Sequence, residues 1–115
     1  MISRLLAALM PIALLALAAC SRMPEAECEK ACLHHARLWF EDQWATKLAQ
    51  APESERAALA EKKEAEWKAV ESDPDAPGRA HCVQTCAKRS SKEQLDCILQ
   101  AQDLATAKIC WEEED

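Results

Sequence analysis

The chain has 115 residues, with 14 basic and 20 acidic side chains and a formal net charge of −6. This negative charge argues against nucleic acid as a partner, because affinity for phosphates comes mainly from lysine and arginine. One glycine and no tyrosine argue against a β fold, since hairpin turns favour glycine and strands favour β-branched and aromatic residues. The composition therefore predicts a single small domain that is all-α.

The first nineteen residues have the pattern of a secretory signal peptide. Arg4 supplies a positive charge, and an apolar run follows from Leu5 to about Ala16. Secretory signals combine a positive start, an apolar region of about 7–15 residues and small residues before the cleavage point. A membrane-spanning helix needs a longer run of about 20 apolar residues. We therefore expect residues 1–19 to be cleaved from the mature protein.

The tetrad Leu17-Ala18-Ala19-Cys20 resembles the lipobox of bacterial lipoproteins, in which small residues precede an invariant cysteine. The resemblance covers the first twenty residues only. It implies cleavage before Cys20, a diacylglyceryl thioether on its sulfur and an acylated amino group, with palmitate among the expected acyl chains. Several acyl chains anchor a protein firmly, since each buried CH2 contributes about 0.8 kcal/mol. Ser21, rather than Asp, follows Cys20, which by resemblance to sorted lipoproteins implies the outer membrane of a Gram-negative bacterium.

The residues after Cys20 predict a lipidated tether over 20–24 and a helical domain over 25–111. From Glu25 to about Gln50 there is no Gly or Pro, and acidic residues in the first turn complement a helix dipole. Helical spacing places four side chains of this helix on one face. These are Cys28, Cys32, His35 and Trp39. We expect His35 to pack, partly buried, beside Trp39.

A second helix is expected from about Pro52 to Glu71, because proline is tolerated only in the first turn of a helix. Its apolar stripe is thin and consists of Leu59, Ala60, Trp67 and Val70. Residues 72–78 contain two prolines and the one glycine, which predicts a loop. Of the four tryptophans, Trp111 is expected to be the most exposed.

Three shorter segments follow the loop. A third helix is expected from about Arg79 to Lys88. Two overlapping capping boxes, Ser90 with Glu93 or Ser91 with Gln94, then predict the start of a fourth helix. Asp103 can cap a last helix that ends near Trp111. Residues 112–115 form an acidic tail whose charge opposes the helix dipole.

With Cys20 assigned to lipid, six cysteines remain, which in a small exported chain predicts a disulfide framework. Four of them form two CxxxC segments, Cys28 with Cys32 and Cys82 with Cys86. Residues four apart lie one turn apart on a helix face, so two neighbouring helices can be bridged twice. This spacing alone leaves open an antiparallel pairing and a parallel one, the latter joining 28 to 82 and 32 to 86.

These four positions resemble the twin-CX3C α-hairpin of small stapled helical proteins of mitochondria and plants. The resemblance implies the antiparallel pairing, Cys28 with Cys86 and Cys32 with Cys82. The chain departs from that family in the 49 residues between its motifs, which contain an additional helix. Cys97 and Cys110 should then pair with each other. On one continuous helix they would be about 20 Å apart, so a bridge requires a turn near Asp103.

An alternative assigns metal binding or thiol redox chemistry to the CxxxC pairs and the nearby histidines, since Cys and His bind zinc. Its residues would be Cys28, Cys32, His35, His81, Cys82 and Cys86. Structural zinc motifs, however, commonly have glycine nearby, and redox motifs use CxxC beside a βαβ unit. No catalytic motif or cofactor signature is present, so we expect no enzyme activity.

The sequence therefore predicts an all-α, disulfide-stapled bundle or hairpin of four to five helices after a cleaved signal peptide. Its pattern also resembles the small cysteine-rich lipoproteins of Gram-negative envelopes. That resemblance implies a non-catalytic structural or protein-interaction module, lipid-anchored outside the cytoplasm, with an envelope protein as its partner.

Overall fold

The structure, a computed structural model, describes residues 22–112. Within this range the chain forms five α-helices and no strand, which confirms the predicted all-α fold. The helices are α2 (Glu25–Gln50), α3 (Glu53–Ser72), α4 (Arg79–Arg89), α5 (Lys92–Gln100) and α6 (Leu104–Glu112). None of these helices combines the length and apolarity needed to cross a bilayer. The predicted signal peptide, the lipidation site Cys20 and residues 113–115 of the acidic tail lie outside the described residues.

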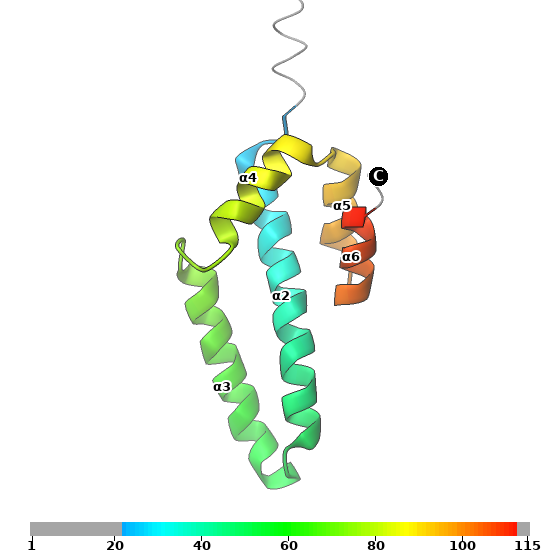
Figure 1. The fold of residues 1–115 in the computed structure, drawn as a ribbon. Helices are drawn as coiled ribbons and strands as arrows, with labels where there is room; N and C mark the ends of the chain where they lie inside the picture. Colours follow the sequence, from blue (N-terminus) through cyan, green and yellow to red (C-terminus); the bar gives the residue numbers. More distant parts are fainter. Residues whose placement is uncertain (1–21, 113–115) are drawn as a thin grey trace, which may run out of the picture.

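Helix α2 is the centre of the domain, because each of the other four helices packs against it (Figure 1). Its 26 residues contain no Gly or Pro, and Glu25 and Glu27 lie in its first turn. Helices α5 and α6 also pack against each other on one side of α2. Helix α3, by contrast, packs along its length only against α2 among the helices that the structure describes. The domain is thus organised around one long helix rather than around a closed bundle.

Helices α2 and α3 form a long hairpin that extends away from the N-terminal end of α2 (Figure 1). The predicted break is confirmed: α2 ends at Gln50, and Pro52 precedes α3 with a φ of −58°, which suits a proline at a helix start. Trp67 holds the hairpin together. It is buried, its ring centroid lies 5.4 Å from that of Phe40, and the Arg37 guanidinium lies 5.0 Å from its ring centroid.

The loop between α3 and α4 redirects the chain without reversing it. Gly78 directly precedes α4 and has a φ of +82°, a conformation that other residues adopt rarely. The chain therefore continues toward the N-terminal end of α2 after the loop, and α4 crosses α2 there (Figure 1). An up-down-up bundle, in which the cysteine-bearing helices would be parallel, would need a full reversal at this loop. The structure instead makes α4 antiparallel to α2.

Local capping fixes the first residues of α5 and α6. Of the two possible capping boxes, the structure forms the one in which Ser91 Oγ accepts from Gln94 N and Gln94 Oε1 accepts from Ser91 N. At α6, Asp103 Oδ1 accepts from Thr106 N over 2.7 Å, as the sequence predicted. This hydrogen bond lowers the pKa of Asp103. The turn between the two helices allows them to form an antiparallel pair.

The main core lies where α2, α4, α5 and α6 meet. Its buried residues are Cys28, Ala31, Cys32, Val83, Cys86, Leu95, Ile98 and Cys110. Half of these are cysteines, so the disulfides themselves fill much of the interior. A smaller buried cluster of Leu38, Ala101 and Ala107 lies between α2 and the turn that joins α5 to α6.

Two expectations about exposed apolar residues were wrong. Trp111 is half-buried, whereas Trp39 is 53% exposed, because α4 begins near Ala36 and runs toward the N-terminal end of α2, away from Trp39 (Figure 1). Ala60 is exposed and Val70 is 39% exposed, so the buried stripe of α3 is thinner than its sequence suggested. Trp67 is the buried residue of that helix.

Candidate functional site

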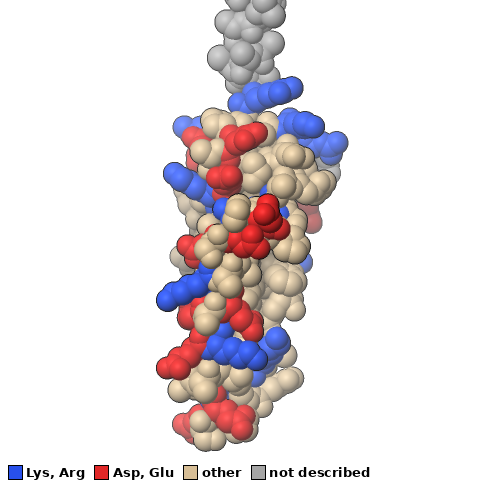
Figure 2. Space-filling model, turned by 90° about the vertical axis from the view of Figure 1, so that its left-hand side faces the viewer, with Lys and Arg blue, Asp and Glu red and all other residues tan. Residues whose placement is uncertain are grey.

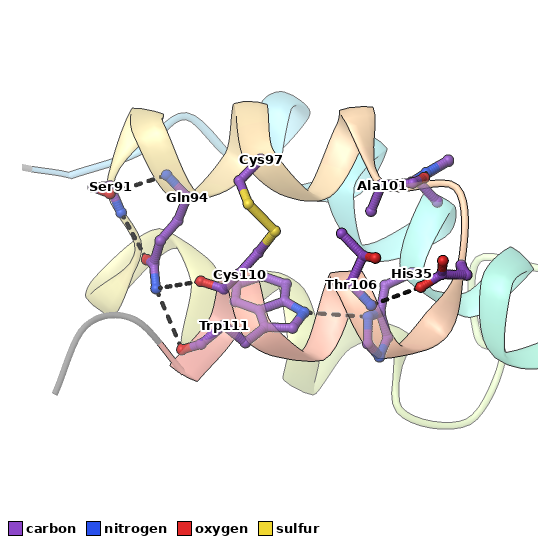
Figure 3. Close-up of a disulfide and its surroundings, with 10 residues drawn as sticks. His35, Ser91, Gln94, Cys97, Ala101, Thr106, Cys110 and Trp111 are labelled. Atoms are coloured by element: carbon purple, nitrogen blue, oxygen red, sulfur yellow. Dashed lines mark hydrogen bonds between the residues drawn. A yellow bond between two sulfur atoms is a disulfide. The ribbon is translucent and has the colours of Figure 1, made fainter.

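Three disulfides connect the helices around α2. Cys28 is bonded to Cys86, with 5.8 Å between their Cα atoms, and Cys32 is bonded to Cys82, with 6.1 Å. This is the antiparallel pairing that the twin-CX3C resemblance implies. The third bond joins Cys97 of α5 to Cys110 of α6, whose Cα atoms are 5.8 Å apart (Figure 3). Together the three bonds hold α4 to α2 twice and α5 to α6 once.

The residues of the metal alternative lie near one another but do not form a ligand set. All four of its sulfurs are in disulfides and therefore offer no thiolate. His35 Nδ1 accepts a hydrogen bond, and His81 is exposed. Across residues 22–112, no group of three or more His, Cys, Asp or Glu side chains is arranged to hold a metal ion. Metal binding at these positions would first require reduction of both bonds.

His35 packs against Trp111 rather than against Trp39. Trp111 Nε1 donates to His35 Nδ1 over 3.2 Å, and the two rings meet edge to face at 72° (Figure 3). Since Nδ1 accepts, the proton of the neutral ring is on Nε2. Partial burial lowers the pKa of His35, and the nearby Lys108 and His34 lower it further. The arrangement therefore favours the neutral imidazole.

An apolar pocket of about 200 Å³ lies beside the Cys32–Cys82 disulfide. It is formed by α2, the end of α3, the loop before α4 and the first turn of α4. Its lining residues are Cys32, Leu33, His35, Ala36, Val70, Ala76, Pro77, Gly78, Arg79 and Cys82. Most of its surface is apolar, so it suits an apolar side chain or a short hydrocarbon segment better than a charged ligand.

Arg79 fixes the loop that forms one wall of this pocket. Its Nη1 donates to the carbonyl oxygens of Glu71, at 3.3 Å, and Asp73, at 3.0 Å. Asp73 Oδ1 in turn accepts from Asp75 N over 2.9 Å. The guanidinium therefore ties the C-terminal end of α3 to the start of α4. Among the residues that line the pocket, none pairs a nucleophile with a general base.

A second, smaller apolar hollow shares Cys82 with the pocket. It has a volume of about 180 Å³ and is lined by His81, Cys82, Thr85, Cys86 and Trp111. The two apolar hollows thus lie along the disulfide ladder. Sequence reasoning had brought Cys32, His35 and Cys82 together, but it missed the contribution of Val70 and of the loop. The apolar pair Ala76-Pro77 within an otherwise polar loop was the signal that could have indicated it.

No protein-family model matches the chain, and neither curated proteins nor solved structures give a significant match.

Proposed function

We propose that this protein is a membrane-anchored extracytoplasmic lipoprotein that acts as a non-catalytic structural or protein-interaction module of the cell envelope. One observation carries the proposal, namely how the seven cysteines divide. Six form the three disulfides of the helical domain. The seventh, Cys20, ends the lipobox-like tetrad that follows an apolar leader. One chain thus combines a sequence for lipid attachment with bonds that persist outside the cytoplasm.

The disulfides support the extracytoplasmic location. Structural disulfides form in oxidising compartments such as the periplasm and are rare in the cytosol, where thiols are kept reduced. Here they also account for a large share of the buried core, because Cys28, Cys86 and Cys110 are at most 1% exposed. A domain whose interior depends on oxidised cysteines in this way fits an exported protein.

The exposed apolar surface supports an interaction role. The pocket beside Cys32–Cys82 is accessible from solvent, and Trp39, which lies on α2 one turn beyond His35 and Ala36, is 53% exposed. Exposed tryptophan beside a preformed apolar pocket is typical of residues that anchor a protein partner. The partner in this proposal is an envelope protein that inserts an apolar side chain into the pocket.

The anchor is tested by a Cys20→Ala variant and a matched Ser21→Ala control. The Cys20→Ala protein should lose acylation and leave the detergent-extractable lipoprotein fraction, because its thioether cannot form. The Ser21→Ala protein should remain acylated. Equal acylation and equal membrane retention of both variants would place the anchor elsewhere and contradict the proposal.

The interaction role is tested by photocrosslinking from intact envelopes. A photoreactive residue at Val70, which lines the pocket, should yield a discrete crosslinked species, and the same residue at Glu61, exposed on α3 outside the pocket, should not. An Ala36→Phe change should fill the pocket and abolish the crosslink at Val70. A crosslink pattern that is the same at both positions, or that survives the filled pocket, would contradict binding at this site.

A further inference from the structure

Basic side chains gather at the end of the domain where the chain enters α2. Arg22 precedes α2, Lys88 and Arg89 lie in the last turn of α4, and Lys92 begins α5. All four residues are exposed. We refer to them as the tether-end cluster. Figure 2 shows basic side chains around the end of the domain from which the grey N-terminal segment extends.

Backbone hydrogen bonds hold the tether-end cluster together. Met23 N donates to Ala87 O over 3.3 Å, which fixes the start of the described chain beside the last turn of α4. Ser90 N donates to Cys86 O over 2.9 Å and ends that helix. The capping box at Ser91 then directs the chain into α5. The backbone at Arg22 and at Lys92 is therefore held close to the last turn of α4, which carries the other two basic residues.

The covalent distance from this cluster to the lipid site is short. Only Ser21 and Arg22 separate Cys20 from Met23, and three residues span at most about 11 Å when fully extended. Charges interact over a screening length of about 8 Å at physiological salt. If the acyl chains of Cys20 are in the bilayer, the cluster cannot move far from the headgroups. This step rests on the proposed lipid anchor.

We propose that the tether-end cluster docks on the headgroups of anionic phospholipids in the membrane that holds the anchor. Clustered lysine and arginine next to a membrane are attracted to anionic lipid, and the attraction grows with each charge. Among the described residues, four carboxylates lie in the adjoining helix ends: Glu25 and Glu27 in the first turn of α2, Glu93 in the first turn of α5, and Glu112 at the end of α6. They equal the four cations in number, but helix N-termini offset part of the negative charge of the first three.

Docking by this end orients the whole domain. The rest of the domain carries more acidic than basic side chains (Figure 2), so an anionic surface attracts one end and repels the remainder. Helix α2 begins at the docked end and has 26 residues, a length of about 39 Å. The tip of the α2–α3 hairpin then lies about 39 Å from the membrane surface. The apolar pocket lies between the docked end of the domain and the tip of the hairpin. A partner in the periplasmic space or on the cell surface can reach it there.

The test is lysine labelling of the full acylated protein in vesicles, read residue by residue by mass spectrometry. One set of vesicles is phosphatidylcholine alone, and the other contains 30% phosphatidylglycerol. Labelling of Lys88 and Lys92 should be slower by more than about threefold in the anionic vesicles, and should recover when salt shortens the screening length. Labelling of Lys47, which is in the last turn of α2 at the opposite end, should be the same in both.

Two charge-matched variants separate docking from a general charge effect. Arg22→Gln with Arg89→Gln removes two cations of the cluster and should abolish most of the protection of Lys88 and Lys92. Lys62→Gln with Lys68→Gln removes two exposed cations of α3 and should leave the protection unchanged. Labelling rates that do not depend on phosphatidylglycerol, or equal effects of the two variants, would overturn the proposal.

The mass of the N-terminal peptide distinguishes this outcome from failure of the anchor. An acylated peptide together with equal labelling in both vesicles overturns the docking proposal and leaves the proposed function standing. A peptide without acyl chains removes the basis of both.

Discussion

Trp111 Nε1 donates a hydrogen bond to Nδ1 of His35 over 3.2 Å, and this contact joins the last helix of the domain to the middle of α2. The two residues are 76 positions apart in sequence. Nδ1 can accept only in the neutral ring, because a protonated imidazole carries a proton on both nitrogens. Attachment of α6 at this point therefore depends on the protonation state of one histidine.

The first prediction concerns pH. Burial lowers the pKa of His35 in the folded protein, with Lys108 and His34 adding to the effect. The unfolded chain therefore binds this proton at higher pH than the folded one. The contribution to stability is fully present above the ordinary histidine range and is lost as pH falls through that range toward the lowered folded pKa. We expect the free energy of unfolding, measured with urea, to decrease between pH 7.5 and about pH 5.

Two asparagine variants provide the control. His35→Asn retains an acceptor near the position of Nδ1 but cannot titrate, so its unfolding free energy should vary less over this range than that of the wild type. His81→Asn changes an exposed histidine and should retain the wild-type pH dependence. A wild-type slope in His35→Asn would show that the pH dependence arises elsewhere.

The second prediction is that Trp67→Ala detaches α3 from α2. Trp67 is 7% exposed, contacts Phe40 and Arg37, and α3 carries no disulfide. Truncation of a buried aromatic residue costs about 3–5 kcal/mol. Hydrogen exchange should accelerate across α3, while α4, α5 and the N-terminal half of α2 remain protected. Val70→Ala, at a position that is 39% exposed, is the control and should have little effect. Uniform loss of protection throughout the domain would mean that α3 belongs to one cooperative core.

The third prediction uses two adjacent serines. Ser91 caps α5 and Ser90 does not, although the sequence allowed either. Ser91→Ala should therefore destabilise the domain by about 1 kcal/mol, and Ser90→Ala should have almost no effect. Urea unfolding of the oxidised protein measures both. Equal destabilisation by the two changes would show that the capping box does not form as described.

The fourth prediction concerns Gln94, the buried polar side chain of the core. Besides its part in the capping box, its Nε2 donates to Cys110 O at 3.3 Å and Trp111 O at 3.4 Å, at the end of α6 (Figure 3). Gln94→Ala should cost about 2 kcal/mol, because it removes the side-chain acceptor of Ser91 N in the capping box and leaves carbonyls of α6 without this donor. In a double variant with Ser91→Ala, the two costs should be less than additive. Full additivity would mean that the residues act independently.

The fifth prediction concerns the two bonds between α2 and α4. Cys28–Cys86 closes a sequence separation of 58 residues and Cys32–Cys82 one of 50. Once either bond is present, the other closes only the short segments between them. In the chain-entropy model the first bond contributes about 4 kcal/mol and the second about 2–3 kcal/mol. Removing one bond by paired Cys→Ser changes should therefore lower the free energy of unfolding by clearly less than half of the loss caused by removing both bonds. Single removals that each cost as much as the double removal would contradict this account.

The helices could be predicted from the sequence because their boundaries depend on local signals. Pro52 set the break after α2, and Asp103 set the start of α6. The fold class followed from composition in the same way. These features depend on residues within a few positions of one another, and such information is available without knowing the tertiary structure.

The exposure of individual tryptophans could not be predicted in this way. Trp39 shares a helix face with Cys28 and Cys32, yet α4 covers the cysteines and not Trp39. The path of α4 depends on Gly78 and on the Arg79 contacts in the preceding loop. For the same reason, Cys spacing alone could not decide between parallel and antiparallel helices. The pocket required Val70 and the loop to approach α2, which no periodicity in either segment indicates.

The most direct test of the central claim is the intact mass of the protein extracted from the membrane fraction, measured before and after thiol alkylation. A lipid-anchored, stapled domain should begin at Cys20, carry the mass of its acyl chains, and be lighter by six hydrogens for three disulfides. It should gain no mass from alkylation unless it is first reduced. An unacylated chain that retains residues 1–19, or six cysteines that alkylate without reduction, would contradict the account.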